Sequence, residues 1–348
     1  MPPKRSRAAS MDAAEPFTFS GARVAPDMAV AVFGRAVFLL HATVVRVHSP
    51  FFDASMSALW WDAANTHAGG DGIRFRYRVA ADGWHSVAVP VPVPADGVKA
   101  EDDGAAREDD GARDERLETE IVKGYHTLFS IFYNKPTFTD HRHTFADIEN
   151  LIVLADIYCA LPVVAPPIEA YLRQGPMWAS INTTSSKYLS RIIYIAIKIQ
   201  SKALFNDAYV CTVGNWKTGN PRGTLGGATS GIDALVDAEV IRIQEMKLAV
   251  KHMLCLAIAS KSLRRFQVDR ILDILSNYDI DADEPRMYRE IKALLQGQNS
   301  IPGIGDLLNA LLCVTLECKE AKPRDRKWLA CARRLKGSEY PWAHDRFN

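Results

Sequence analysis

The chain of 348 residues is longer than one typical domain requires, and its 48% hydrophobic residues suffice for the cores of two folded units. Its 42 basic and 41 acidic residues nearly cancel, so no whole-molecule field favours a nucleic acid or a membrane as the main partner. No run reaches the roughly 18 uninterrupted apolar residues of a membrane span, and the first ten residues lack the apolar stretch of a secretory signal.

The six cysteines are scattered through mainly apolar runs, and no two of them form a Cys-x-x-Cys pair. Such spacing is typical of reduced thiols inside a cell rather than of a disulfide framework or a zinc site. We therefore expect a cytoplasmic or nuclear protein that has no metal and no cofactor.

Residues 1–20 combine Ala, Ser, Pro and charged residues, and this composition predicts a disordered arm. Lys4, Arg5 and Arg7 match a nuclear import signal weakly, and a solvated tail is the favoured interpretation of these charges. Order is expected to begin near Asp27.

Two short apolar runs follow, at 28–33 and 36–40, and the Gly34-Arg35 pair between them predicts a tight turn between two strands. A short helix is expected over 41–47. A second helix is expected to begin at Pro50, with Ser49 as its cap.

Alternating residues rich in Val, Phe, Tyr and Trp predict strands at 74–79 and 84–89. The prolines at 90, 92 and 94 are expected to end sheet pairing, because proline has no amide to donate. Between Asp96 and Glu120 there are eleven acidic and four basic residues, which predicts a disordered insertion at about 95–118. An acidic docking tail for a basic partner is the alternative interpretation.

Helical periodicity begins after this insertion. Apolar residues recur 4, 7, 8 and 11 positions after Ile121, and together they form one helical face: Ile121, Tyr125, Leu128, Phe129 and Phe132. Further helices are predicted at 151–158, 162–172, 188–205, 235–259, 268–275, 287–295 and 306–316. In the longest, one stripe holds Val240, Ile243, Val250, Met253, Leu254 and Ala257.

Two segments of the second half have no helical pattern. Residues 214–231 contain six glycines and predict an exposed, mobile loop. Residues 319–336 carry eight basic and two acidic residues, which favours an exposed basic tail over a nucleic-acid patch.

Four motifs appear in order along the first half. They are Asp27-Met-Ala-Val-Ala-Val-Phe-Gly-Arg-Ala-Val-Phe-Leu-Leu-His41, Ser49-Pro50-Phe51-Phe52, the helix end Leu128 to Tyr133, and Leu151-Ile-Val-Leu-Ala-Asp-Ile-Tyr158 followed by Leu161-Pro162. Together with the predicted element order, they resemble the BTB/POZ domain, over residues 20 to 175 or about half of the chain. The acidic insertion is similar to those of divergent, fungal-type members.

The resemblance implies an α+β fold, in which a small sheet flanked by helices forms a BTB/POZ-like domain over 21–175. An all-α region follows over 180–318, with a basic tail over 319–348. The family implies a non-enzymatic adaptor that forms homodimers or pairs with another BTB protein, and that can serve a cullin-type ubiquitin ligase. Partner or dimer-interface candidates are Asp27, His41, Pro50, Phe51 and Phe52, although a structural role is the favoured interpretation for His41 and a packing role for Phe51 and Phe52.

The sequence departs from the family in two places. Cullin-binding members carry an apolar-x-Glu element, whereas residues 54–64 contain no Glu. Members that regulate transcription have a basic residue after the His, whereas Ala42 stands here. A nuclear transcriptional regulator or co-factor that uses the basic terminal segments is the alternative function; a membrane is excluded as a partner and a nucleic acid is not expected.

No set of residues predicts catalysis. Asp140, His141 and His143 are possible metal ligands, but adjacent residues such as Asp140 and His141 point to opposite sides of an extended chain and no third ligand is marked nearby, so a solvated loop is favoured over a metal site. Ser230 lies one position away from a nucleophile elbow, and no partner histidine is marked.

Overall fold

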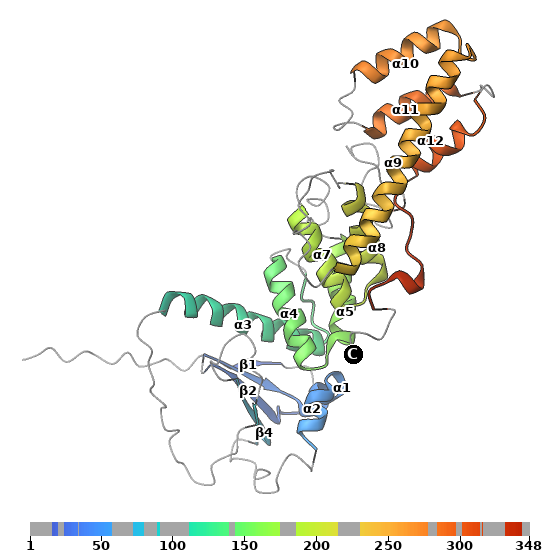
Figure 1. Ribbon diagram of the computed structural model, residues 1–348. Coiled ribbons are helices and arrows are strands. Elements are labelled where there is room, and N and C mark those ends of the chain that lie inside the picture. Colours follow the sequence, from blue (N-terminus) through green and yellow to red (C-terminus); the bar gives the residue numbers. More distant parts are fainter. Residues whose placement is uncertain are drawn as a thin grey trace, which may run out of the picture. The chain divides into compact units, whose positions relative to one another are not determined.

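The structure is a computed structural model (Figure 1). It describes residues 16–19, 24–33, 35–57, 72–79, 89–90, 111–138, 143–174, 186–214, 230–277, 284–296, 301–313, 315 and 331–342. The chain divides into two compact units, Met1–Pro166 and Pro167–Asn348, and each is described by itself. The division falls inside helix α5 (Leu161–Gln174), earlier than the domain end expected at residue 175.

Unit 1 is built on a mixed sheet of five strands in the order β1-β3-β2-β4-β5. The strands are β1 (Phe17–Thr18), β2 (Met28–Val32), β3 (Ala36–Leu40), β4 (Phe75–Val79) and β5 (Val89–Pro90). The predicted hairpin is confirmed, because β2 and β3 pair antiparallel with Val30 opposite Phe38. Strand β4 then lies parallel to β2, which requires the crossover connection that the intervening helices supply.

The hairpin turn contains a residue with a left-handed backbone. Phe33 has φ of 51°, a conformation that is costly for a residue with a β-carbon, by about 1 kcal/mol. The amide of Arg35 donates to the carbonyl of Val32 at 3.0 Å and closes the turn.

The helices of unit 1 follow the predicted order: α1 (Ala42–His48), α2 (Pro50–Ser55), α3 (Gly111–Phe132), α4 (Phe145–Ile157) and α5. The two short helices are confirmed, with Pro50 in the first turn of α2 and Ser49 as its cap. The stripe predicted from Ile121 to Phe132 is buried along its whole length, and α3 packs against α4. A mixed α+β fold, mostly helical, is therefore observed.

Ordered structure begins earlier than expected at the N-terminal side. The predicted disordered arm, 1–20, is wrong for Phe17–Thr18, which form β1 and pair parallel with β3. Phe17 stacks on Phe38 with ring centroids 5.2 Å apart, and Phe19 is 2% exposed. Phe17 in β1 is 41% exposed but stacks on Phe38, and Phe19 directly after β1 is buried, so these two aromatic contacts offset the entropy cost of ordering this short segment.

The acidic insertion, predicted at 95–118, is also shorter than expected, because α3 already begins at Gly111. Residues 112–120 are mainly Ala, Arg, Glu and Leu, which have high helix propensity. Extending an existing helix toward its N-terminus avoids the cost of a new nucleus, so these charged residues continue α3. Residues 95–110 lie outside the described ranges.

The prolines at 90, 92 and 94 were expected to end sheet pairing, and this prediction is wrong for Pro90. Pro90 lies in β5 and is paired with Tyr77 of β4. Strand β5 is an edge strand, where a proline without an amide removes no bond to a further strand. Of the strand expected over 84–89, only Val89 is described.

Unit 2 contains α7 (Ser186–Lys198), α8 (Lys202–Gly214), α9 (Ser230–Ala259), α10 (Arg265–Asn277), α11 (Glu284–Leu295), α12 (Ile304–Leu312) and the 3-10 turn η4 (Gly337–Glu339). The single helix predicted over 188–205 is two helices, α7 and α8. Gln200 has a left-handed φ of 53°, and the Ser201 hydroxyl accepts from the amide of Leu204 at 3.2 Å, which caps α8. Helices α7 and α8 pack against each other, and α9 packs against α8 and α12 (Figure 1).

The expected exposed basic tail, 319–348, is wrong for residues 331–342, which we call the strap. Cys331, Ala332, Leu335 and Tyr340 of the strap are buried. Its apolar residues supply the burial that a purely charged tail would lack, so this part folds onto unit 2. The glycine-rich loop predicted over 214–231 lies mostly outside the described residues, as do the basic cluster near the N-terminus and residues 316–330.

Candidate functional site

The two polar residues singled out by the sequence, Asp27 and His41, lie where β2, β3 and α1 meet. The Oδ1 atom of Asp27 accepts from the amide of Ala42 at 2.7 Å, which satisfies the first free amide of α1. The backbone carbonyl of Asp27 accepts from the amides of Arg74 and Phe75, at 2.8 and 3.1 Å. Asp27 therefore connects α1 and the start of β4 to the start of β2.

His41 is 5% exposed and connects this corner to the end of α3. Its Nε2 lies 2.8 Å from the carbonyl of Val24, and its Nδ1 lies 2.9 Å from the Tyr133 hydroxyl. Because a carbonyl can only accept, Nε2 donates to the carbonyl of Val24, and the Tyr133 hydroxyl is hydrogen-bonded to Nδ1. The same hydroxyl oxygen accepts from the His41 amide at 2.6 Å.

The Tyr133 hydroxyl remains protonated and can act as the donor in this network. Burial raises the pKa of Tyr133 above its usual value, and the negative charge of Asp27 acts in the same direction, whereas the hydrogen bond from the His41 amide opposes them. The arrangement positions strands and helices relative to one another within unit 1.

The Ser-Pro-Phe-Phe motif joins α2 to α4. The Ser49 hydroxyl donates to the carbonyl of Tyr158 at 2.6 Å and accepts from the amide of Phe52 at 3.3 Å. Phe52, with no exposed surface, stacks on Tyr158 with ring centroids 4.9 Å apart and an interplanar angle of 12°. The Tyr158 hydroxyl lies 2.6 Å from that of Tyr125, whose pKa is raised by burial and by the neighbouring Tyr158.

The structure separates the five candidate residues into two groups. His41 and Phe52 are buried and Asp27 is half-buried, so these three hold the unit together. Pro50 is exposed and Phe51 is half-buried. Near them in the sequence, Val47 on α1 is 79% exposed, so we call Val47, Pro50 and Phe51 the α1–α2 surface.

Replacing Asp27 by alanine is expected to lower the free energy of unfolding of unit 1 by about 1 kcal/mol, because a free amide at the start of α1 loses its acceptor. Asn keeps an oxygen at the same place, so Asp27→Asn is expected to cost less than half as much. Urea denaturation followed by circular dichroism measures both. Equal losses for the two variants would contradict the capping role.

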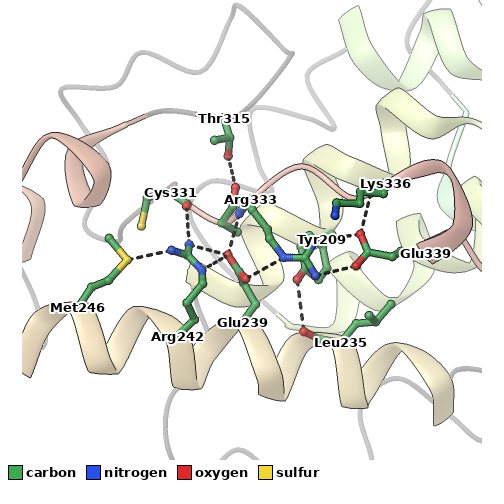
Figure 2. Close-up of polar contacts among 11 residues, drawn as sticks. Tyr209, Leu235, Glu239, Arg242, Met246, Thr315, Cys331, Arg333, Lys336 and Glu339 are labelled. Carbon is green, nitrogen blue, oxygen red and sulfur yellow. Dashed lines mark hydrogen bonds and ion pairs between the residues drawn. The ribbon is translucent and has the colours of Figure 1, made fainter. Parts of the chain in front are cut away.

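A second cluster, which the sequence did not reveal, lies in unit 2 (Figure 2). Glu239 on α9 is 3% exposed and accepts from Nε and Nη2 of Arg242 at 3.0 and 2.7 Å. The same carboxylate accepts from the backbone amide of Arg333 at 2.7 Å. Arg242 also donates through Nη2 to the carbonyl of Cys331 at 3.2 Å, so α9 holds the strap by side-chain and backbone contacts.

The strap is stabilised further along its length. Arg333 donates to both oxygens of Glu339, at 2.8 and 2.7 Å, and these bonds help to lower the pKa of Glu339 to about 2. Tyr340 stacks on Trp342 with ring centroids 5.0 Å apart, and its hydroxyl accepts from Nδ2 of Asn206 at 2.8 Å. Burial raises the pKa of the Cys331 thiol to about 11, so that thiol stays protonated near neutral pH.

The position of Glu239 within the apolar pattern of α9 could have revealed this cluster. Glu239 lies three residues after Val236 and four before Ile243, on the buried side of α9, where a charged residue requires a partner. Its partner Arg333 is 94 positions away, and nothing in the sequence connects the two.

These contacts favour a structural role for the Glu239 cluster. The strong donors around its carboxylate are guanidinium and amide groups of the chain itself, as in a buried ion pair. Within the described ranges no three His, Cys, Asp or Glu side chains gather as metal ligands, and His143 lies 2.8 Å from the carbonyl of Thr137. The helices that the structure describes include none with the length and apolarity to cross a bilayer.

Comparisons with known proteins give no match to a family model, to a curated protein or to a solved structure.

Proposed function

We propose that the chain is a BTB/POZ-type adaptor, which pairs with a second copy of itself, or with another BTB protein, through unit 1. A further protein would be held elsewhere on the chain, and a cullin-type ubiquitin ligase is one option for its role. Support comes from the order of elements, β2, β3, α1, α2, β4, α3, α4 and α5, which agrees with the order implied by the resemblance.

The motif residues support the proposal as well, because each has a packing or capping role that accounts for its residue type. Asp27 caps α1, His41 bonds Tyr133, and Ser49 and Phe52 join α2 to Tyr158. Arg333 counts against the nucleic-acid alternative, because its guanidinium already contacts Glu239 and Glu339.

The observation that carries the proposal is the α1–α2 surface. Val47, in the last turn of α1, is 79% exposed, and the exposed Pro50 and half-buried Phe51 open α2, so apolar side chains are accessible where α1 ends and α2 begins. Such an area on a small unit is typical of a protein interface, where burial of apolar groups contributes about 25 cal/mol per Å².

Light scattering at micromolar concentration is expected to show a particle at least near twice 38.6 kDa. Val47→Glu is expected to reduce the particle mass by half, because a carboxylate would be buried in the apolar contact. Val24→Glu makes the same change at a valine of unit 1 that is 70% exposed, and it is expected to leave the mass unchanged. A wild-type chain that is a strict monomer would overturn pairing with a second copy, and equal effects of the two variants would overturn the role of the α1–α2 surface.

A further inference from the structure

Helix α9 carries large apolar side chains on two sides. One side holds the buried stripe, including Ile243, Val250 and Leu254. On the other side Ile241, Leu248 and Leu256 are 58%, 67% and 55% exposed, although a helix on a protein surface normally presents polar residues there.

The exposed residues recur with a seven-residue spacing. Ile241, Leu248 and Cys255 are seven positions apart, and Glu245, His252 and Leu256 are also exposed. We call these six residues the α9 outer face. Seven positions are close to two helical turns, so the six form one strip about 23 Å long.

Charged residues of opposite sign lie on the two sides of Leu248. Glu245 of the α9 outer face precedes it, and the exposed Lys251, at the edge of this face, follows it. A parallel partner helix with the same sequence would place Glu245 near Glu245 and Lys251 near Lys251. An antiparallel copy instead places Glu245 of each helix level with Lys251 of the other, which is favourable at both ends.

We propose that the α9 outer face binds the same face of a second copy of this chain, with the two helices antiparallel and a two-fold axis near Leu248. Ile241 of one copy then lies level with Cys255 of the other, and the two Leu248 side chains meet at the centre. Such an interface is self-complementary, as two-fold symmetry requires.

This inference goes beyond the proposed function and does not depend on it. The α1–α2 surface lies in unit 1 and the α9 outer face in unit 2. A chain with two self-complementary surfaces assembles into particles larger than a dimer, and a chain with only one of them stops at the dimer.

Cysteine cross-linking of the full chain tests the geometry, in the wild-type background and in Val47→Glu. Under mild oxidation, Ile241→Cys is expected to form a disulfide with Cys255 of another copy, and Leu248→Cys with itself. Leu272→Cys on α10, at a leucine that is 53% exposed, is the matched control and is expected to form little product. Mass spectrometry of the linked peptides identifies each pair.

Charge reversal tests the partner assignment. Glu245→Lys and Lys251→Glu are each expected to weaken pairing of the Val47→Glu chain by about fivefold, and the double variant is expected to restore it. Residues 245 and 251 are six positions apart and do not face each other on one helix, so recovery reports a contact between copies.

The outcomes separate this inference from the proposed function. A Val47→Glu chain that still forms the 241–255 and 248–248 disulfides supports the α9 interface, whatever the effect of Val47→Glu on mass. Links between two Ile241→Cys positions, equal yield from Leu272→Cys, or no recovery in the double reversal would overturn it. A Val47→Glu chain that is monomeric and forms no link would also overturn it, and would leave the proposed function standing.

Discussion

Phe52→Ala is expected to lower the free energy of unfolding of unit 1 by about 3–5 kcal/mol. Phe52 has no exposed surface, and its ring is held on one face by Tyr158 and edge-on by Tyr77, with ring centroids 4.9 and 5.3 Å apart. Truncation removes these aromatic contacts and leaves a cavity, because helix α2 is fixed by the Ser49 cap and cannot collapse freely onto the sheet.

Phe51→Ala is the matched control for this change. Phe51 is the preceding residue on the same helix, but it is only half-buried, so we expect less than half of the loss of unfolding free energy seen for Phe52→Ala. Urea denaturation followed by circular dichroism measures both variants. Equal losses of unfolding free energy in the two variants would show that the buried Phe52 side chain does not determine the packing of α2.

Glu239→Gln is expected to weaken attachment of the strap to unit 2 by about 2 kcal/mol. The carboxylate accepts from Arg242 and from the amide of Arg333, and an amide in its place offers one acceptor and two unwanted donors. The full cost of breaking a buried ion pair, about 3–5 kcal/mol, is not expected, because the arginine side chains are 37% and 42% exposed and water can solvate them.

The Cys331 thiol reports directly on this attachment. It is 5% exposed and burial raises its pKa to about 11, so reaction with a maleimide requires the strap to open. A loss of about 2 kcal/mol corresponds to a labelling rate of Cys331 about 30-fold higher in Glu239→Gln, while the exposed Cys255 should react at an unchanged rate.

Glu290→Gln provides the contrast. Glu290 lies 3.4 Å from Arg286 in an ion pair on α11, and the Arg286 side chain is 65% exposed. Exposed pairs of this kind contribute about 0.3–0.5 kcal/mol, so labelling of Cys331 should not change. A Cys331 rate that is the same in Glu239→Gln and in the wild type would show that the strap does not depend on the buried carboxylate.

Local patterns in the sequence were sufficient for most of unit 1. The apolar runs on either side of Gly34-Arg35 predicted the hairpin, Ser49-Pro50 predicted the start of α2, and the spacing from Ile121 predicted the buried face of α3. In each case the signal spans a few residues, because a turn, a cap or a helix face is determined by neighbours in the chain.

The errors have a common cause. Phe17 belongs to a strand because Phe38 lies beside it, Pro90 is tolerated because β5 is an edge strand, and the strap is held by contacts with α9 and α8. Each of these predictions depended on the composition of one segment alone. Composition does not reveal how much apolar area of that segment a distant part of the chain covers after folding.

The sequence by itself determined the mixed α+β class, the strands and helices of the hairpin region, and which face of each main helix is apolar. Only the tertiary structure decided that His41 and Phe52 are internal, that Val47 is exposed, and that Glu239 meets Arg333 across 94 positions. The physical reason is that burial and charge pairing depend on contacts between segments far apart in the chain, whereas periodicity and capping depend on adjacent residues.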